Sequence, residues 1–294
     1  MMGVNVRAYS KINLRLEVLG KRDDGYHEVW MVMQMLRLWD NIHISSARRN
    51  RIFSNHEFVP NNRNNLAMKA AELMQEYYQM PQVSITIQKN IPVSAGMAGG
   101  SSDAAAVLLG MRELFNQKIT TEDLCTLGEK LGSDVPFCIM GPTALAYGRG
   151  EKITPLPSPK KLYVLVIKAN FGVSTAKIYQ QFELSKKVQG DYLAFKKAME
   201  EKNIDYILAN LSNDLETTTF SLYPKVELTK RDLLNRGIRH VLMSGSGPTV
   251  FSLFKTSEEA MYWFKVLQKD YPHILLTTTL VAEDLDDRVL KCDD

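Results

Sequence analysis

One twenty-residue stretch constrains this chain more than any other: IPVSAGMAGGSSDAAAVLLG, residues 91–110. Residues 94–102 hold three glycines and three serines: Gly96, Gly99, Gly100, Ser94, Ser101 and Ser102. The alternating segment 83–88 before it predicts a strand, and the alanine-rich half predicts a helix from about Ser102 to Phe115. The N-terminus of a helix attracts anions, because its first N–H groups are free and its dipole is positive there. The stretch therefore predicts a phosphate site; the alternative is a glycine turn required only for tight helix–sheet packing.

The loop matches neither of two common nucleotide motifs. No lysine follows the glycines, which excludes a Walker loop, and their spacing is not the GxGxxG of a dinucleotide fold. A second serine–glycine loop, LMSGSGPTVF at residues 242–251, places Gly245 and Gly247 between two predicted strands. Two such loops predict that a nucleotide and a second ligand meet at a seam between domains.

Composition excludes several classes of protein. The 294 residues suit two domains, and a net charge of +3 is too small for a nucleic-acid-binding protein. No apolar run is long enough to cross a bilayer, and the N-terminal segment does not resemble a signal peptide. The three cysteines form no CxxC pair, which disfavours a zinc site. We therefore expect a cytoplasmic protein that binds neither nucleic acid nor membrane.

Helical and strand patterns alternate irregularly along the chain, which predicts an α+β fold of two domains. The first strand alternates over residues 4–18 and ends in an Asp24-Gly25 hairpin turn, while residues 29–46 resemble a further pair of strands. Helices are expected over 66–80, 121–131, 174–183, 190–201, 223–236 and 257–271, and further strands over 162–169, 240–254 and 273–282. Asn65 and a Thr120–Asp123 capping box should begin the first two helices. Pro155 and Pro159, which bracket the segment LPS, suggest a boundary between domains 1–157 and 158–294.

Four segments resemble motifs of the GHMP kinases, which are ATP-dependent kinases of small molecules. PVSAGMAGGSSDAAA is similar to their P-x-x-x-G-(L/M)-x-x-x-S-S core. SKINLRLEVLGKRDDGYHE, LGSDVPFCIMGPTALAYGRGE and LMSGSGPTVF are similar to further motifs of one branch. That branch phosphorylates the 2-hydroxyl of 4-diphosphocytidyl-2-C-methyl-D-erythritol in the non-mevalonate route to isoprenoids. Tyr9-Ser10 departs from the family's usual Pro-Ala, and Met97 replaces a common leucine.

The resemblance covers nearly the whole chain in order, and it implies a fold and a reaction. The fold is a ribosomal-S5-like N-terminal domain and a ferredoxin-like C-terminal domain, with the active site in the cleft between them. Asp134 is the predicted general base, since it follows a glycine helix end and precedes Val-Pro; an aspartate that caps the next element is the alternative. Lys11 is its predicted partner, because a lysine in an apolar strand needs a reason; the alternative is an edge lysine that reaches solvent.

ATP is the implied phosphoryl donor, with Mg²⁺ carried by its phosphates rather than by dedicated protein ligands. The resemblance assigns its binding to the glycine loop and to two residues on the adenosine side. The loop residues are Pro92, Val93, Ser94, Ala95, Gly96, Met97, Ala98, Gly99, Gly100, Ser101 and Ser102; the other two are Asn65 and Lys89.

The acceptor substrate is expected to carry a cytidine diphosphate group. Its predicted site residues are Asn13, Tyr26, His27, Tyr179, Gly245 and Ser246. Tyr26, His27 and Tyr179 offer rings and an imidazole for a base, and Asn13 offers an amide for the hydroxyls. A kinase for another small alcohol (mevalonate, homoserine or a sugar) and a nucleotide-binding protein without catalysis are the alternatives. We expect a monomer or a homodimer.

Overall fold

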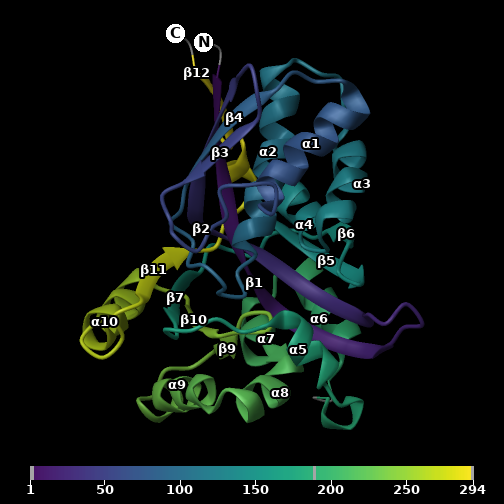
Figure 1. Cartoon of the computed structure of the whole chain (residues 1–294). Helices are drawn as coiled ribbons and strands as arrows, with labels where there is room; N and C mark the ends of the chain where they lie inside the picture. The colour runs from purple at the N-terminus through teal and green to yellow at the C-terminus, as the bar shows by residue number, and fades with distance from the viewer. Residues whose placement is uncertain (1–2, 188–189, 293–294) are drawn as a thin grey trace.

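The computed structural model describes residues 3–187 and 190–292. Figure 1 shows two halves, the upper one formed around a large sheet with α1 to α4 beside it, and the lower one holding the smaller sheet. The two longest strands run through both halves, so the halves share a backbone framework. This arrangement of separate sheets and helices confirms the predicted α+β class.

The larger sheet has eight strands, with the path β12-β1-β2-β4-β3 and with β5, β6 and β8 attached beside it. These strands are β1 (Gly3–Lys21), β2 (His27–Ser46), β3 (Arg51–Ser54), β4 (Val83–Gln88), β5 (Thr143–Gly148), β6 (Lys152–Pro155), β8 (Ser212–Asn213) and β12 (Val289–Cys292). The C-terminal strand β12 thus pairs with the N-terminal strand β1, so that Gly3 lies opposite Cys292 at the other end of the described chain.

The prediction of two strands over residues 29–46 is wrong, because β2 is one strand of 20 residues. Its antiparallel register with β1 shifts between the pairs Tyr9↔Trp39 and Lys11↔Met35. The extra residues of β2 form an irregularity within one strand there. A pattern of alternating polarity cannot distinguish such an irregularity from a turn between two strands. The predicted hairpin turn around Asp24-Gly25 is confirmed.

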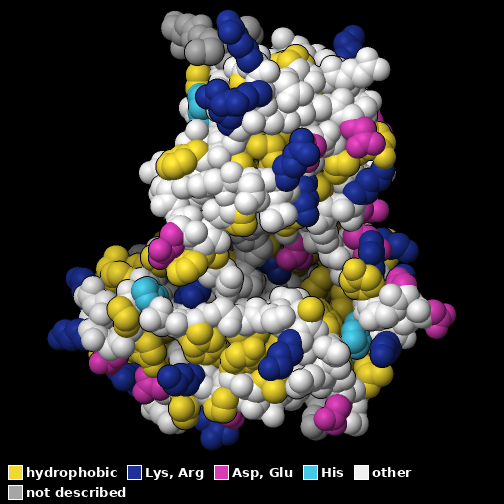
Figure 2. All heavy atoms as spheres, in the orientation of Figure 1, with side chains coloured by type: hydrophobic (Ala, Val, Ile, Leu, Met, Phe, Trp, Pro, Cys, Tyr) yellow, Lys and Arg dark blue, Asp and Glu magenta, His cyan; other side chains and the backbone are white. Residues whose placement is uncertain are grey.

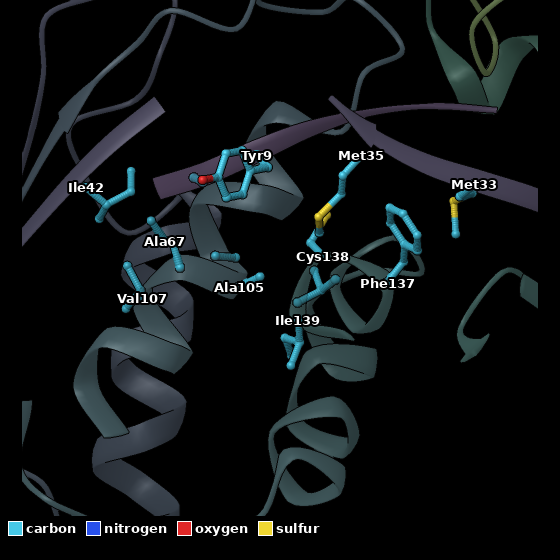
Figure 3. Close-up of a cluster of buried hydrophobic side chains, with 14 of the residues drawn as sticks. Tyr9, Met33, Met35, Ile42, Ala67, Ala105, Val107, Phe137, Cys138 and Ile139 are labelled. Carbon is cyan, nitrogen blue, oxygen red and sulfur yellow. The ribbon is translucent and has the colours of Figure 1, made fainter. Parts of the chain in front are cut away.

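Four helices accompany the larger sheet: α1 (Leu66–Tyr78), α2 (Gly99–Leu114), α3 (Thr121–Leu131) and α4 (Val135–Met140). The Asn65 cap and the Thr120–Asp123 capping box begin α1 and α3 as predicted. Figure 3 shows side chains of α1, α2 and α4 meeting those of β1 and β2 in one apolar core. This packing fixes both α2 and α4, the two helices that border the site described below.

The smaller sheet is antiparallel, with the order β11-β7-β10-β9. Its strands are β7 (Tyr163–Lys168), β9 (Val241–Met243), β10 (Thr249–Phe254) and β11 (Ile274–Thr278). The accompanying helices are α5 (Thr175–Gln180), η1 (Leu184–Lys186), α6 (Tyr192–Glu200), α7 (Ile204–Ala209), α8 (Leu215–Leu222), α9 (Pro224–Asn235), α10 (Ser257–Leu267) and η2 (Ala282–Leu285). Helices α7 and α8 were not predicted. The proposed boundary near residues 155–159 lies between β6 and β7, while β12 returns to the larger sheet.

Candidate active site

A cavity of about 1020 Å³ opens where the two halves meet. Figure 2 shows the surface hollowed at this level. Its walls come from the glycine loop, the β1–β2 hairpin, the loop before α4, α5 and the second glycine loop. Every residue that the sequence predicted for the site lines this cavity except Ser102.

The glycine loop ends directly in α2, which begins at Gly99, three residues earlier than predicted. Ala98 precedes it in the left-handed conformation (φ 58°) and offers no side chain to cap the helix. The first N–H groups of a helix have no partner within it, so those of α2 remain available to a ligand. Helix α2 has 16 residues and its N-terminus lines the cavity, so this end of the helix can hold phosphate oxygens.

Ser102 does not fill the role predicted for it. Its hydroxyl donates a 2.6 Å hydrogen bond to the backbone oxygen of Tyr9, and its N–H donates to Ala98. The side chain is fully buried. Ser102 therefore joins α2 to β1, and among the paired serines only Ser101 lines the cavity.

The two glycine loops touch each other across the seam between the halves. The Ser244 hydroxyl donates to the backbone oxygen of Gly96 over 3.0 Å. Gly96 has φ 71°, and a Cβ atom on it would lie 2.4 Å from the backbone oxygen of Ser244. Gly96 thus serves packing, but between two loops rather than between helix and sheet.

Lys11 and Asp134 lie next to each other in the cavity wall. The Lys11 ammonium lies 3.5 Å from the Asp134 carboxylate and donates a 2.9 Å hydrogen bond to Asn13. Lys11 is only 4% exposed, so it does not reach bulk solvent from a sheet edge. Asp134 occupies the N-cap position of α4 but makes no side-chain capping hydrogen bond. Both alternative interpretations of these residues are therefore wrong.

The C-terminal segment holds α4, and with it Asp134, in place. Arg288 is buried and donates to the carbonyl oxygens of Cys138 (2.6 Å) and Ile139 (3.1 Å) near the end of α4. These are carbonyls that a helix end leaves without internal partners. Burial lowers the pKa of Arg288 to about 10.

Lys89 lies beneath the glycine loop in a buried cluster with Asp40 and Asp103. Its ammonium is 2.5 Å from Asp40 and 2.8 Å from Asp103. The other oxygen of Asp40 accepts the backbone N–H of Asn90 and of Ile91 at the start of the loop. Burial favours a lower pKa of Lys89, but the charges of Asp103 and Asp40 outweigh it and raise that pKa. Burial also raises the pKa of Asp103 to about 8, against the opposing charge of Lys89.

Lys89 and Asn65, both predicted for the adenosine side, use their side chains within the protein. The Lys89 ammonium is occupied by the two carboxylates. The Asn65 oxygen accepts the N–H of Ala67 and its amide donates to the carbonyl of Pro60. Both residues shape the cavity wall rather than presenting free polar groups.

The far end of the cavity is aromatic. The His27 ring lies 5.4 Å from that of Tyr179 and 6.2 Å from that of Phe182. Burial, followed by the charge of Lys21, lowers the pKa of His27. Burial and the charges of Asp134 and Asp214 raise the pKa of Tyr179. An uncharged imidazole among rings suits a planar base better than it suits an aliphatic acid.

The second glycine loop also contributes to this wall. The hydroxyls of Ser246 and Thr175 are 2.7 Å apart, which joins the loop to the start of α5. Asn213 donates to the carbonyl oxygens of Met243 and Gly245 and supports the loop from behind. Gly245 and Ser246 therefore face the cavity on a loop with several fixed contacts.

The part of the chain that the structure describes contains no group of three or more His, Cys, Asp or Glu side chains placed to hold a metal ion. Within the same residues, no helix has the length and apolar character needed to cross a membrane.

Comparison with known proteins places the chain in a family. The GHMP kinase N-terminal domain family matches residues 65–142, and the GHMP kinase C-terminal family matches residues 184–261. The chain is 43% identical to the 4-diphosphocytidyl-2-C-methyl-D-erythritol kinase of Lachnoclostridium phytofermentans, across 90% of this chain and 93% of that protein. It is 46% identical to the enzyme of the same name from Bacillus velezensis, across 86% and 88% of the two chains. The chain belongs to the 4-diphosphocytidyl-2-C-methyl-D-erythritol kinase family.

Solved structures agree with this family and confirm the predicted two-domain GHMP kinase fold. A crystal structure of 4-(cytidine 5'-diphospho)-2C-methyl-D-erythritol kinase has a TM-score of 0.78 and 30% identity, and it covers 94% of this chain and 98% of its own. A homoserine kinase from Cytophaga hutchinsonii has a TM-score of 0.74 at 17% identity, across 99% and 97% of the chains. The second likeness is one of fold alone.

Phe182 and Arg149 are among the cavity residues that the sequence prediction missed. Phe182 follows α5 in a segment without a regular pattern, so nothing marked its ring as part of the aromatic end. Arg149 lies within the quoted GRGE segment, but its position over the Tyr26 ring depends on how two distant hairpins meet. A search for aromatic and basic residues beside the recognised motifs would have included both.

Proposed function

We propose that this chain transfers the γ-phosphoryl group of ATP to the 2-hydroxyl of 4-diphosphocytidyl-2-C-methyl-D-erythritol, a step of non-mevalonate isoprenoid biosynthesis. The observation that carries the proposal is that the Lys11–Asp134 pair lines the same cavity as the N-terminus of α2 and the His27–Tyr179 aromatic pair. One cavity thus offers a place for a phosphate chain, for a reacting hydroxyl and for a planar base.

Asp134 is the proposed general base. Its carboxylate is 30% exposed and free of capping duty, so it can accept the proton that the attacking hydroxyl loses. Lys11 lies against that carboxylate and favours negative charge on the attacking oxygen. Asn13 accepts a hydrogen bond from the same ammonium, which helps to fix the position of Lys11 beside Asp134.

The N–H groups at the start of α2 and the Ser101 side chain are the proposed contacts of the transferred phosphate. Phosphoryl transfer depends mainly on positioning and on neutralisation of charge, and a helix N-terminus supplies both. Mg²⁺ would arrive with the nucleotide, since its phosphate oxygens and water are sufficient ligands for that ion. The chain itself would contribute the N-terminus of α2, which holds the phosphate, and Asp134, which takes the proton.

The aromatic end favours the cytidylyl substrate over another small alcohol. His27, Tyr179 and Phe182 form a pocket that mevalonate, homoserine or a sugar would not require. The Lys11–Asp134 pair favours catalysis over simple nucleotide binding, because a protein that only binds nucleotide needs no base beside a lysine.

The experiment is a comparison of acceptors at fixed ATP and Mg²⁺. ADP release is measured with the cytidylyl substrate and, in parallel, with methylerythritol phosphate, mevalonate and homoserine. We expect turnover with the first alone. Turnover with a cytidine-free alcohol and none with the cytidylyl substrate would contradict the proposal.

A further inference from the structure

Arg149 is a cation of the cavity that the mechanism above does not use. It lies in the turn between β5 and β6, and its side chain is 32% exposed. Its nearest carboxylate is that of Glu151, 3.9 Å from Nε, which is too far for a hydrogen bond. Within the described residues we find no protein acceptor for the guanidinium, so its donors remain available to a ligand.

The Arg149 guanidinium lies over an aromatic ring. Its central carbon lies 5.0 Å from the centre of the Tyr26 ring. Contact with a ring face restrains a guanidinium while its N–H groups still point outward in the plane of the group. Two parallel N–H groups in that plane match the oxygens of a phosphate. The Tyr26 ring is 55% exposed, so this contact leaves much of its surface uncovered.

The turn that carries Arg149 adjoins both ends of the acceptor site. Gly150 packs near Ser133, the residue directly before the proposed base, with 3.7 Å between the serine Cβ and the place of a glycine Cβ. On the other side, Tyr26 is the chain neighbour of His27 in the aromatic pocket. A ligand that spans the distance from the base to the pocket therefore passes this turn.

We propose that Arg149 binds the diphosphate of the acceptor substrate and makes the enzyme select acceptors that carry one. This inference rests on the proposed function, in which a diphosphate connects the nucleoside to the reacting alcohol. Lys21 also lines this end of the cavity and adds positive charge, while Glu151 and Asp24 offset part of it. Of Lys21 and Arg149, which both line the cavity, only Arg149 has a planar guanidinium, and that group lies over the Tyr26 ring.

The test is the Arg149→Gln variant, compared with wild type in steady-state kinetics and inhibition. Loss of a charge-assisted bidentate contact should raise KM for the cytidylyl substrate by roughly 10- to 100-fold. KM for ATP should stay unchanged. Inhibition by CDP against the cytidylyl substrate should weaken by the same factor, whereas inhibition by cytidine should not change. Arg149→Lys should recover only part of the loss, because an ammonium cannot reproduce the planar fork.

Lys152→Gln is the matched control. Lys152 lies in β6 over the Tyr147 ring, at 5.9 Å, but it does not line the cavity. Its replacement removes a cation from the same hairpin and should leave both inhibition constants unchanged.

The outcomes separate this inference from the proposed function. If wild type uses the cytidylyl substrate and Arg149→Gln keeps its KM and its CDP inhibition, Arg149 does not bind the diphosphate. Equal weakening of CDP and cytidine would also overturn the inference, because Arg149 would then act only by supporting Tyr26. If wild type does not use the cytidylyl substrate, the proposed function fails and this inference fails with it. Should Arg149→Gln not fold, the ratio of CDP to cytidine inhibition in Arg149→Lys decides in the same way.

Discussion

Replacement of Gly96 by alanine should separate the two glycine loops that form the centre of the site. A Cβ at this position would lie 2.4 Å from the backbone oxygen of Ser244 and 2.8 Å from that of Gly247. Real Cβ atoms essentially never lie closer than 3.0 Å to another heavy atom, and neither opposing atom belongs to a flexible side chain. One loop must therefore move by more than half an ångström, about the tolerance within which catalytic groups must be held.

Two effects of Gly96→Ala can be measured separately. The left-handed backbone, with φ 71°, should cost about 1–2 kcal/mol in the free energy of unfolding once a Cβ is present. The displaced loop should in addition lower kcat/KM by on the order of 10²-fold, because small misplacements at a reacting centre have effects of this size. Urea denaturation reports the first effect, and ADP release with the cytidylyl substrate reports the second.

Gly237→Ala is the matched control for this experiment. Gly237 has φ 91°, and nothing lies within 4 Å of the place its Cβ would occupy. Gly237→Ala should lower the free energy of unfolding by a similar amount and leave kcat/KM unchanged. If Gly96→Ala behaves like Gly237→Ala in both assays, the two loops do not meet as described and the reasoning is refuted.

Three further predictions concern the buried polar groups around the glycine loop. Lys89→Met should lower the free energy of unfolding by about 3–5 kcal/mol, because it leaves the buried side chains of Asp40 and Asp103 without their cation. The control, Lys197→Gln at an exposed ion pair, should cost less than about 1 kcal/mol. Urea denaturation measures both variants. Burial raises the pKa of Asp103 to about 8, so its contribution to stability is complete below about pH 4 and is lost as the pH rises through 8. Asp103→Asn should therefore be less destabilising at about pH 8.5 than at about pH 5, and an equal effect at both would contradict the shifted pKa. Ser102→Ala should cost about 1–3 kcal/mol of stability through its lost bond to Tyr9 and leave KM for ATP unchanged; a large rise in that KM would return Ser102 to the phosphate site.

The sequence correctly predicted helices and strands that are marked by residues close together in the chain. The Thr120–Asp123 box lies within four residues, and the alternation of β4 follows directly from one buried face. The resemblance to the GHMP kinases then predicted which residues form the site, and 20 of the 21 residues it assigned line a single cavity: all but Ser102. These residues lie in short motifs, which can be recognised from the sequence alone.

The features that escaped prediction depend on distant parts of the chain. Ser102 belongs to a serine pair beside glycines, and only the approach of β1 decides which hydroxyl faces the cavity. In the sequence, Lys89 resembles a cation available to a ligand. In the structure it is paired with Asp40 and Asp103, which are 49 and 14 residues away in sequence. The support of α4 by Arg288 crosses 150 residues of sequence. A single sequence contains no local signal for such pairs.

The Asp134→Asn variant tests the central claim most directly. Asparagine keeps the size of the side chain next to Lys11 but cannot accept the proton of the attacking hydroxyl. Phosphoryl transfer to the cytidylyl substrate is followed by ADP release, and ATP binding is measured on the same preparation by calorimetry. We predict that transfer falls by at least about 10²-fold while the affinity for ATP stays within a few-fold of wild type. Near-normal transfer in Asp134→Asn would contradict the assignment of the base and the mechanism built on it.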